Sequence, residues 1–467
     1  MLWVNLEMLI DNLDDTIVAI STAAGEGSIG IVRLSGPRAL AIADAVFVGK
    51  SGLKPSEFKT YTMHYGKIVW AGQMLDEVIL SLMRAPHSYT REDVVEINCH
   101  GGIVALRKVL DLVLENGCRL ATPGEFTRRA FLNGRIDLAQ AEAVIDIIRA
   151  KTDSALKLGL EQLRGGLSKE IDKIRQALLD ILVILEANID FPEEDFKQQD
   201  MKEVLLGLAA VRAQLDRLLD SAKTGRILRD GIHVVICGKP NVGKSSLLNA
   251  LLKKERALVT PVAGTTRDSI EEMIDIKGIP VRIVDTAGIL KPRNLIEKKA
   301  VWRAKIHINS ADLIIILFDA NRRLNKDDWE LIKKVKNKVV IAVINKIDLK
   351  EYIQKDEISK AFHKVVELSA KKAKNIDLLE EALCELVYKG RLRHQEFMLV
   401  SNLRHINALK EAQKLLNNTT SALADKLPLE FLAQDLRDAS VYLDRILGKD
   451  FSGDLLDRIF SDFCIGK

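Results

Sequence analysis

The stretch Gly238-Lys-Pro-Asn-Val-Gly243-Lys244-Ser245 decides how this sequence is interpreted. It has the pattern of a P-loop, in which a glycine and four residues precede Gly-Lys-Ser. The apolar run at residues 233–237 predicts a strand before it, and residues 246–252 predict a helix after it. Glycines let backbone N–H groups turn toward phosphate oxygens, and the N-terminus of a helix favours negative charge. The sequence therefore predicts a phosphate-binding loop between a strand and a helix.

Strands and helices alternate over the segment that contains this loop. Further apolar runs of strand length occur at residues 281–284, 313–318, 339–344 and 365–368. Such alternation is typical of βαβ units, which build a mostly parallel sheet with flanking helices. The sequence therefore predicts a P-loop G domain over residues 225–388.

Four shorter motifs follow the loop in chain order, namely Gly264-Thr-Thr-Arg-Asp268, Asp285-Thr-Ala-Gly288, Asn345-Lys346-Ile-Asp348 and Ser369-Ala370-Lys371. Each is weak by itself, but five motifs in this order are typical of a GTP-binding domain. The Asp348 carboxylate can accept hydrogen bonds from the N1–H and the N2 amine of guanine, where adenine presents the wrong pattern. The motifs therefore predict a site for GTP rather than ATP.

The same motifs predict individual roles. Lys244 can reach the β- and γ-phosphates and is a predicted catalytic residue, and the hydroxyls of Ser245 and Thr266 can ligate Mg²⁺. Asp285 can hold the Mg²⁺ shell through water, and the Gly288 N–H can contact the γ-phosphate. The full predicted GTP-binding set is Asn241, Val242, Gly243, Lys244, Ser245, Ser246, Thr260, Pro261, Val262, Ala263, Gly264, Thr265, Thr266, Asp285, Thr286, Ala287, Gly288, Asn345, Lys346, Asp348, Ser369 and Ala370.

The residue that follows the Asp-x-x-Gly motif is Ile289. In Ras-like enzymes a glutamine at this place orients the attacking water, which isoleucine cannot do. Hydrolysis must be organised by another group, or it is very slow. Glu297 is the acidic candidate downstream, although a glutamate in such a charged segment is more often simply solvated.

The segments on either side of the G domain have different predicted secondary structure. Residues 29–34, 67–70, 78–82 and 94–97 predict strands, with a helix at residues 104–114, so this part is expected to be α+β. Residues 138–164, 167–190 and 202–223 have the spacing of amphipathic helices, and the chain is helical again after residue 393. The two helical stretches are expected to pack together, because neither can bury its apolar face alone.

The expected organisation is a multidomain α/β and α protein with an inserted G domain. The predicted parts are an N-terminal extension at residues 1–14, an α+β domain at 15–123, a first helical part at 124–224, the G domain at 225–388 and a second helical part at 389–467.

Composition sets outer limits on the function. Of 467 residues, 47% are hydrophobic and 29% charged, and the net charge of +4 permits contact with a polyanion without arguing for one. The five cysteines fit neither a zinc site nor a CxxC pair, which favours a reduced, cytoplasmic chain. Residues 1–10 lack the features of a signal peptide, and no apolar run reaches transmembrane length.

The P-loop and the Ala263-Gly-Thr-Thr-Arg-Asp268 stretch resemble the TrmE–Era–EngA superfamily of GTPases. Within it, the flanks resemble the MnmE (TrmE) family of tRNA modification GTPases. The matching stretches are residues 15–19 with 27–33, residues 123–143 and residues 463–467. The resemblance covers residues 15–467 and leaves residues 1–13 as an extra segment.

This resemblance implies a cytoplasmic homodimer that works with an FAD-dependent partner, MnmG (GidA), in a heterotetramer. Together they would add an aminomethyl or carboxymethylaminomethyl group at C5 of the wobble uridine of tRNA. The one-carbon unit would come from a tetrahydrofolate derivative in the 5-formyl or methylene form. GTP hydrolysis would drive movement of the G domain rather than the carbon chemistry.

The resemblance also implies further site residues. A potassium ion would replace the missing glutamine chemistry, with Asn241, Thr260, Val262 and Thr265 as its ligands, and Glu297 would orient water through a bridging water. The implied folate-binding residues are Arg33, Glu96, Arg135 and Lys467. Without the resemblance, each of these charged residues is more readily a surface charge or a structural ion pair. Cys464 by itself is a small packing residue, and the family places it facing the folate site.

An Era- or EngA-like ribosome-assembly GTPase is the alternative. Era-like chains add a KH domain with a Gly-x-x-Gly loop, and EngA-like chains carry two G domains. This sequence has one G domain and a helical C-terminal part, which favours the first interpretation.

Overall fold

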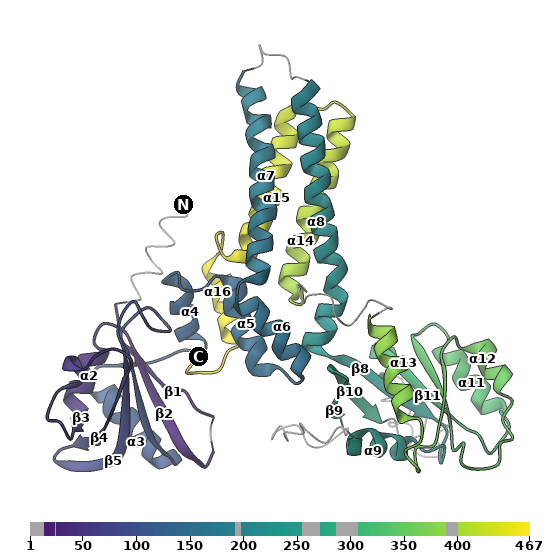
Figure 1. Cartoon of the computed structure of the whole chain (residues 1–467), viewed down its shortest axis with the longest axis horizontal. Helices are drawn as coiled ribbons and strands as arrows, with labels where there is room; N and C mark the ends of the chain where they lie inside the picture. Colours follow the sequence, from purple (N-terminus) through teal and green to yellow (C-terminus); the bar gives the residue numbers. More distant parts are fainter. Residues whose placement is uncertain (1–13, 24, 192–197, 255–270, 286–306, 389–399) are drawn as a thin grey trace. The chain divides into compact units, whose positions relative to one another are not determined.

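The computed structural model describes residues 14–23, 25–191, 198–254, 271–285, 307–388 and 400–467. By internal contacts the chain forms two compact units. Figure 1 labels the helices and strands along the chain. The first contains Met1–Ile145, Leu163–Leu182 and Ala433–Lys467, and the second contains Asp146–Gln162 and Val183–Leu432.

A seven-stranded sheet in the order β3-β4-β5-β6-β2-β1-β7 forms the base of the first unit. Neighbouring strands pair antiparallel, except that β1 pairs with β7 in parallel. The four strands expected from the sequence are confirmed. The strand bounds are β1 (Ile17–Ile20), β2 (Gly27–Ser35), β3 (Phe47–Gly49), β4 (Thr62–Trp70), β5 (Gln73–Met83), β6 (Val94–Gly101) and β7 (Arg119–Leu120).

Helices α2 (Ala39–Val46) and α3 (Ile103–Glu115) pack on one face of this sheet, and a 3₁₀ turn, η1 (Pro55–Glu57), lies beside α2. Because side chains alternate across a strand, every second residue of the central strands points into this core. The opposite face carries exposed apolar side chains, among them Met63 and Tyr65 of β4 and Ile79 of β5. Tyr65 and Ile79 are direct cross-strand partners.

The first unit continues into helices. Helices α4 (Glu125–Leu132) and α16 (Gly453–Ser461) share a core that includes Phe131, Leu456 and Phe460. Within the same unit, α7 (Gly166–Asp190) is joined to α15 (Leu429–Leu447) by an ion pair of 2.5 Å between Arg175 Nε and Asp444 Oδ1. The expected packing of the two helical stretches is thereby confirmed.

The single helix expected over residues 138–164 is wrong. The structure has α5 (Leu138–Arg149) and α6 (Asp153–Leu163), separated by a short break. Thr152 begins α6 by accepting a hydrogen bond of 3.1 Å from the Ala155 N–H, and threonine is favoured at such N-caps. The Thr152 hydroxyl also donates to the carbonyl of Gly278, in the turn between two strands of the second unit.

The second unit contains a six-stranded sheet in the order β13-β12-β11-β8-β10-β9. All neighbours are parallel except β9, which pairs antiparallel with β10 and was not predicted from the sequence. The strands are β8 (Ile232–Gly238), β9 (Glu271–Ile276), β10 (Ile279–Asp285), β11 (Leu313–Asp319), β12 (Val340–Asn345) and β13 (Val365–Leu368). The flanking helices are α9 (Lys244–Lys254), α11 (Lys326–Val335), α12 (Lys355–Ala361) and α13 (Ile376–Tyr388).

Helix α8 (Gln198–Asp230) packs against α14 (Leu403–Ala424) and is longer than the predicted helix at residues 202–223. It leads into β8 through Gly231 alone, which has φ +81°. Leu158 of α6 and Leu228 of α8 are buried in the core of the sheet domain. The ends of these helices are therefore part of the folded body that carries the P-loop.

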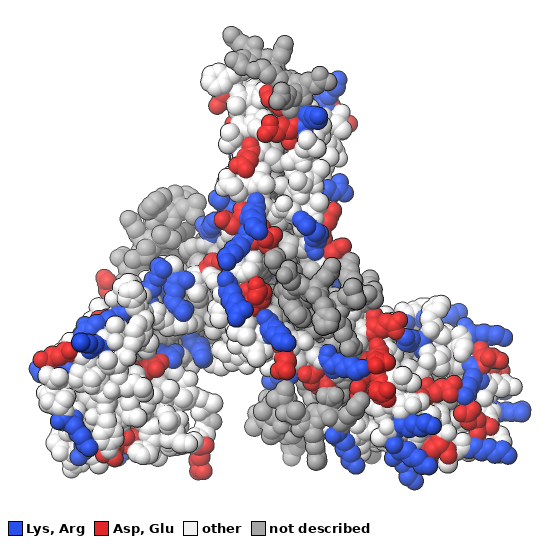
Figure 2. All heavy atoms as spheres, in the orientation of Figure 1, with Lys and Arg blue, Asp and Glu red and all other residues white. Residues whose placement is uncertain are grey.

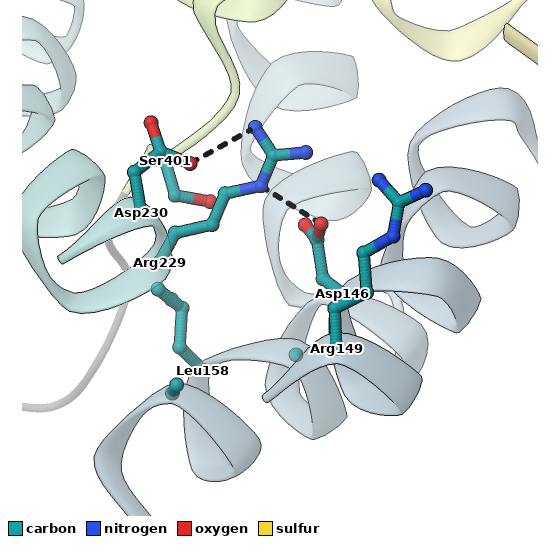
Figure 3. Close-up of a pocket in the computed structure, with 8 residues that line it drawn as sticks. Asp146, Arg149, Leu158, Arg229, Asp230 and Ser401 are labelled. Carbon is teal, nitrogen blue, oxygen red and sulfur yellow. Dashed lines mark hydrogen bonds and ion pairs between the residues drawn. The ribbon is translucent and has the colours of Figure 1, made fainter. Parts of the chain in front are cut away.

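A small polar pocket lies at this junction (Figure 3). Arg229 Nε is 2.8 Å from Asp146 Oδ1, and the Gln162 side chain donates to the Ser401 hydroxyl at 3.1 Å. The ion pair joins the end of α8 to the end of α5 within the second unit.

Candidate functional site

The predicted P-loop connects the end of β8 to the start of α9. Gly238 has φ +152° and Gly243 has φ +100°, a region that favours glycine. A Cβ on Gly243 would lie 2.2 Å from the Asn345 side-chain nitrogen, and one on Gly238 would lie 2.8 Å from the Leu317 carbonyl oxygen. Both glycines are therefore required by close approach as well as by backbone conformation.

The predicted catalytic lysine is held inside this loop. Lys244 is buried, and its Nζ donates to the carbonyl oxygens of Lys239 at 2.9 Å and Gly238 at 3.1 Å. Ser245 and Ser246 follow in the first turn of α9 and are exposed. The ammonium thus lies at the helix N-terminus, where an anionic phosphate group would also be favoured.

Asn345 joins three of the predicted motifs. Its side-chain amide donates to the Val242 carbonyl at 2.8 Å, and its side-chain oxygen accepts from the Ala370 N–H at 2.9 Å. The residue is buried at the end of β12. The P-loop, the Asn-Lys-x-Asp motif and the Ser-Ala-Lys motif therefore meet at one edge of the sheet.

The next residues of the motif extend this junction. Lys346 Nζ donates to the Asn241 carbonyl at 2.7 Å and to Asp319 Oδ2 at 2.6 Å. The Ser369 hydroxyl donates to Asp348 Oδ1 at 2.6 Å. This hydrogen bond is the main cause that lowers the pKa of Asp348 below its ordinary value, so the group stays an acceptor. Asp348 remains partly exposed and can meet a ligand.

Part of the predicted site lies outside the described residues. Asp285 ends β10 beside β8, with Ile236 as its cross-strand partner, so its backbone is at the same sheet edge. The predicted residues that lie outside are Thr260, Pro261, Val262, Ala263, Gly264, Thr265, Thr266, Thr286, Ala287, Gly288 and Glu297.

The first unit brings two of the predicted folate residues together. Arg33 of β2 and Glu96 of β6 are cross-strand partners, and Arg33 Nη2 lies 2.7 Å from Glu96 Oε1. Arg33 Nη1 also donates to the Gly466 carbonyl at 3.2 Å. Both charged side chains keep nearly one fifth of their surface exposed, at 18% and 19%.

Arg135 lies near the same pair through an aromatic ring. Its guanidinium is 4.8 Å from the centroid of Tyr89, whose hydroxyl is 2.9 Å from the Thr127 hydroxyl. Burial raises the pKa of the Tyr89 phenol above its ordinary value. The positive charges of both Arg135 and Arg33 act on the pKa of that phenol in the opposite direction.

The segment that ends at Lys467 docks onto this region. The Phe126 N–H donates to the Lys467 carbonyl at 3.2 Å, and the Gly124 N–H donates to the Cys464 carbonyl at 3.4 Å. Gly466 has φ +93°, and a Cβ there would lie 2.5 Å from the Ile20 carbonyl oxygen. Cys464 is an exposed free thiol rather than a packed one.

Sequence reasoning missed several residues of this region. Phe126 lies under Arg33, with 5.7 Å between guanidinium and ring centroid, and Tyr89 lies under Arg135. Phe126 belongs to the stretch at residues 123–143 that carried the family resemblance, so this stretch was a usable signal. Tyr89 lies in a loop between Pro86 and Arg91 that has no periodic pattern.

A mostly parallel sheet with a P-loop at its carboxyl edge, bridged to an Asn-Lys-x-Asp motif, defines a P-loop protein of the GTP-binding class. Family models give a narrower assignment. A model described as the MnmE helical domain matches residues 138–464, and one described as GTP-binding protein TrmE N-terminus matches residues 16–135. The chain belongs to the MnmE family of tRNA modification GTPases.

Full-length relatives agree with this assignment. The tRNA modification GTPase MnmE of Alkaliphilus metalliredigens is 48% identical over 459 residues, which are 97% of this chain and 100% of the relative. The protein of the same name from Clostridioides difficile is 46% identical over 457 residues, again 97% and 100% of the two chains. Among solved structures, Aquifex aeolicus Era bound to GDP·AlF4⁻ is 32% identical over 39% of this chain and 66% of its own, with a TM-score of 0.28.

Proposed function

We propose that this chain hydrolyses GTP at the P-loop and couples hydrolysis to modification of the wobble uridine in tRNA. The observation that carries the GTP site is the bridge from Asn345 to the P-loop carbonyl of Val242, at 2.8 Å. This bridge brings Asp348 and Ser369 to the same sheet edge as Lys244. A guanine acceptor and a phosphate cradle at one edge suit a guanine nucleotide better than an adenine nucleotide.

Side chains and backbone amides would divide the work of hydrolysis. Asp348 would accept from guanine, Lys244 would donate to phosphate oxygens, and the N–H groups of residues 241–245 would hold the negative charge. Mg²⁺ would be held by Ser245 and Thr266 and would neutralise charge on the phosphates. Glu297 would orient the attacking water.

Potassium activation is a further part of the proposal. Asn241, an exposed P-loop residue with φ +65°, is the one proposed ligand in the described residues, beside Thr260, Val262 and Thr265 outside them. Replacement of K⁺ by Na⁺ should then lower GTP turnover, and Glu297→Ala should lower it in either salt. Equal turnover in K⁺ and Na⁺ would show that potassium has no role.

The Arg33–Glu96 pair is proposed to bind a tetrahydrofolate derivative, in the 5-formyl or methylene form, together with Arg135 and Lys467. A glutamate acceptor suits the N–H donors of a pterin, and arginines suit the carboxylates of a folate tail. Arg33→Ala should weaken binding of 5-formyltetrahydrofolate in a titration while leaving GDP binding unchanged. Lys244→Ala is the matched control, which should weaken GDP binding and leave binding of 5-formyltetrahydrofolate unchanged.

The partners are proposed from the family. We propose a homodimer that joins an FAD-dependent MnmG-type protein in a heterotetramer and acts on tRNA in the cytoplasm. The five cysteines all lie in described segments and form no disulfide there, which suits a reducing compartment. On the face drawn in Figure 2, Lys and Arg are interspersed with Asp and Glu, so the tRNA proposal rests on the family rather than on charge. No helix in the described segments is long and apolar enough to cross a membrane.

Nucleoside mass spectrometry of bulk tRNA tests the whole proposal. Cells that lack this chain should lose C5-aminomethyl-type wobble uridines, and the restored gene should bring them back, whereas Lys244→Ala should not. Unchanged uridines would leave a GTPase of another role, such as ribosome assembly.

A further inference from the structure

Lys239, the second residue of the P-loop, has a buried charged side chain with a role that the loop motif does not require. Its Nζ donates to the Asn325 side-chain oxygen and lies 2.5 Å from Asp328 Oδ2. The side chains of Lys239 and Asp328 are 6% and 7% exposed. An ion pair this deeply buried is costly to break from one side, because the remaining charge is left without a partner.

The two acceptors form the capping box of α11. The Asn325 side-chain oxygen accepts from the N–H of Asp327 at 3.0 Å and of Asp328 at 3.3 Å. In return, Asp328 Oδ2 accepts from the Asn325 N–H at 2.9 Å. These reciprocal hydrogen bonds fix both oxygens, so Lys239 is tied to the start of a helix rather than to a mobile surface carboxylate.

The backbone of the same residue holds the catalytic lysine. The Lys239 carbonyl accepts from Lys244 Nζ at 2.9 Å, beside the Gly238 carbonyl at 3.1 Å. One residue therefore connects α11, through its side chain, with Lys244, through its peptide group.

We infer that Lys239, Asn325 and Asp328 form a P-loop anchor that fixes the first turn of the loop in its nucleotide-binding conformation. Lys239 is a positioning residue, because it acts through the loop backbone and Lys244. Asp328 also neutralises the Lys239 ammonium next to the phosphate site. The inference rests on the proposed binding of guanine nucleotides at this loop.

The anchor differs in its consequences from a purely stabilising ion pair. A pair that only stabilises the domain would change the thermal midpoint and leave nucleotide binding by the folded protein unchanged. An anchor that preorganises the loop would weaken the binding of GDP and GTP alike. It would leave kcat at saturating GTP nearly unchanged, because the ground state and the transition state lose the same interaction.

The test uses the full chain and fluorescent mant-GDP. Lys239→Met and Asp328→Asn should each raise the Kd for mant-GDP about tenfold, mainly through faster dissociation, which corresponds to about 1.4 kcal/mol. The double variant should bind mant-GDP no less tightly than the single variant with the lower affinity, because both substitutions remove the same ion pair. Asparagine at position 328 can still accept the capping hydrogen bond, so this variant removes the charge and keeps the helix start. Lys239→Arg, which keeps the cation, should restore most of the affinity.

Lys355→Met is the matched control in the same domain. Lys355 lies 2.8 Å from Glu367, but the two side chains are 37% and 41% exposed, so no change in mant-GDP affinity is expected. Two results would overturn the anchor: an unchanged dissociation rate despite a lower thermal midpoint, or single effects that multiply in the double variant. Failure of the parent chain itself to bind mant-GDP would instead contradict the proposed function.

Discussion

At the scale of single residues, Asn345 and Asp348 of the same motif have different parts in the candidate nucleotide site. Asn345 uses both ends of its side-chain amide on the protein, toward Val242 and Ala370. Asp348 accepts a hydrogen bond from the Ser369 hydroxyl and keeps part of its surface exposed. Asn345 therefore joins the three motifs, and Asp348 is the residue that we propose contacts the base.

Asp348→Ala should weaken the binding of both GDP and GTP by at least about tenfold, because two hydrogen bonds from guanine lose a charged acceptor. Titration with mant-GDP measures this loss. Ser369→Ala is the control, since it keeps the carboxylate and removes only its support, and it should cost less. Parent-like affinity of Asp348→Ala would remove the aspartate from the base-binding site.

The meeting of the motif residues Lys244, Asn345 and Asp348 at one edge of the sheet could be predicted from the sequence, because each motif follows a strand of the same parallel sheet. The pairing of Lys239 with Asp328 could not be predicted, because 89 residues separate the two and neither spacing nor composition links them. Tyr89 was missed for the same reason. Its neighbours Arg135 and Thr127 are nearby in space only through the packing of α4.

At the scale of elements, the junction between α8 and β8 depends on one glycine. Gly231 has φ +81°, and a Cβ there would lie 2.7 Å from the Pro280 carbonyl oxygen. The alternation of strands and helices predicted the sheet but not this junction. It also did not predict the edge strand β9, because the charged residues Glu271, Glu272 and Asp275 leave only a short apolar pattern there. The break between α5 and α6 was not predicted either, because the apolar spacing of a helix continues across Thr152.

Gly231→Ala should lower the free energy of unfolding by about 2–3 kcal/mol, from a strained φ together with a backbone clash. Chemical denaturation followed by circular dichroism gives the value. Gly72→Ala separates the two causes, because Gly72 has φ +79° with open space around it and should cost only about 1 kcal/mol. Equal losses for the two variants would mean that the clash is relieved.

Helix α4 begins with an ion-pair cluster that makes stability depend on pH. Burial by itself would raise the pKa of Glu125, but hydrogen bonds from Arg119 and the Thr122 N–H lower it to about 2. The charge of Arg129, which is 1% exposed, acts in the same direction. A carboxylate with a depressed pKa stabilises the fold above its ordinary pKa and loses that contribution as the pH falls toward its folded value.

Stability should therefore fall between about pH 4.5 and pH 2 by roughly 1–2 kcal/mol on account of Glu125, after allowance for solvent screening. Urea denaturation at several pH values measures the slope. Glu125→Gln should be less stable at neutral pH and should flatten the curve in this window. Glu115→Gln, at an exposed position on α3, should leave the slope as it is.

At the scale of the whole molecule, one face of the sheet in the first unit is covered by α2 and α3, and the other is exposed at β4 and β5. Arg33 and Glu96 lie on the same face as Tyr65 and Ile79, as the cross-strand pairs and the alternation of side chains require. An open face with exposed apolar side chains is the candidate contact of the proposed homodimer.

Replacement of Tyr65 and Ile79 together by glutamate should shift the mass measured by light scattering from dimer toward monomer, because charge at an apolar contact disfavours association. Val183→Glu is the control, since Val183 is 67% exposed on α7 outside the sheet. A double variant that keeps the dimer mass would place the contact elsewhere.

The docking of residues 466 and 467 beside Arg33 also affects the order in which parts of the chain can fold during synthesis. The hydrogen bond from Arg33 to the Gly466 carbonyl joins positions 433 residues apart. At a synthesis rate of about 5–20 residues per second, roughly 20–90 s pass between the emergence of the two ends of this contact from the ribosome. Until Gly466 emerges, the N-terminal sheet lacks this contact, whereas all strands of the P-loop sheet have been synthesised before that point and are free to fold. A nascent chain should therefore acquire its nucleotide site before Arg33 gains its contact with the Gly466 carbonyl.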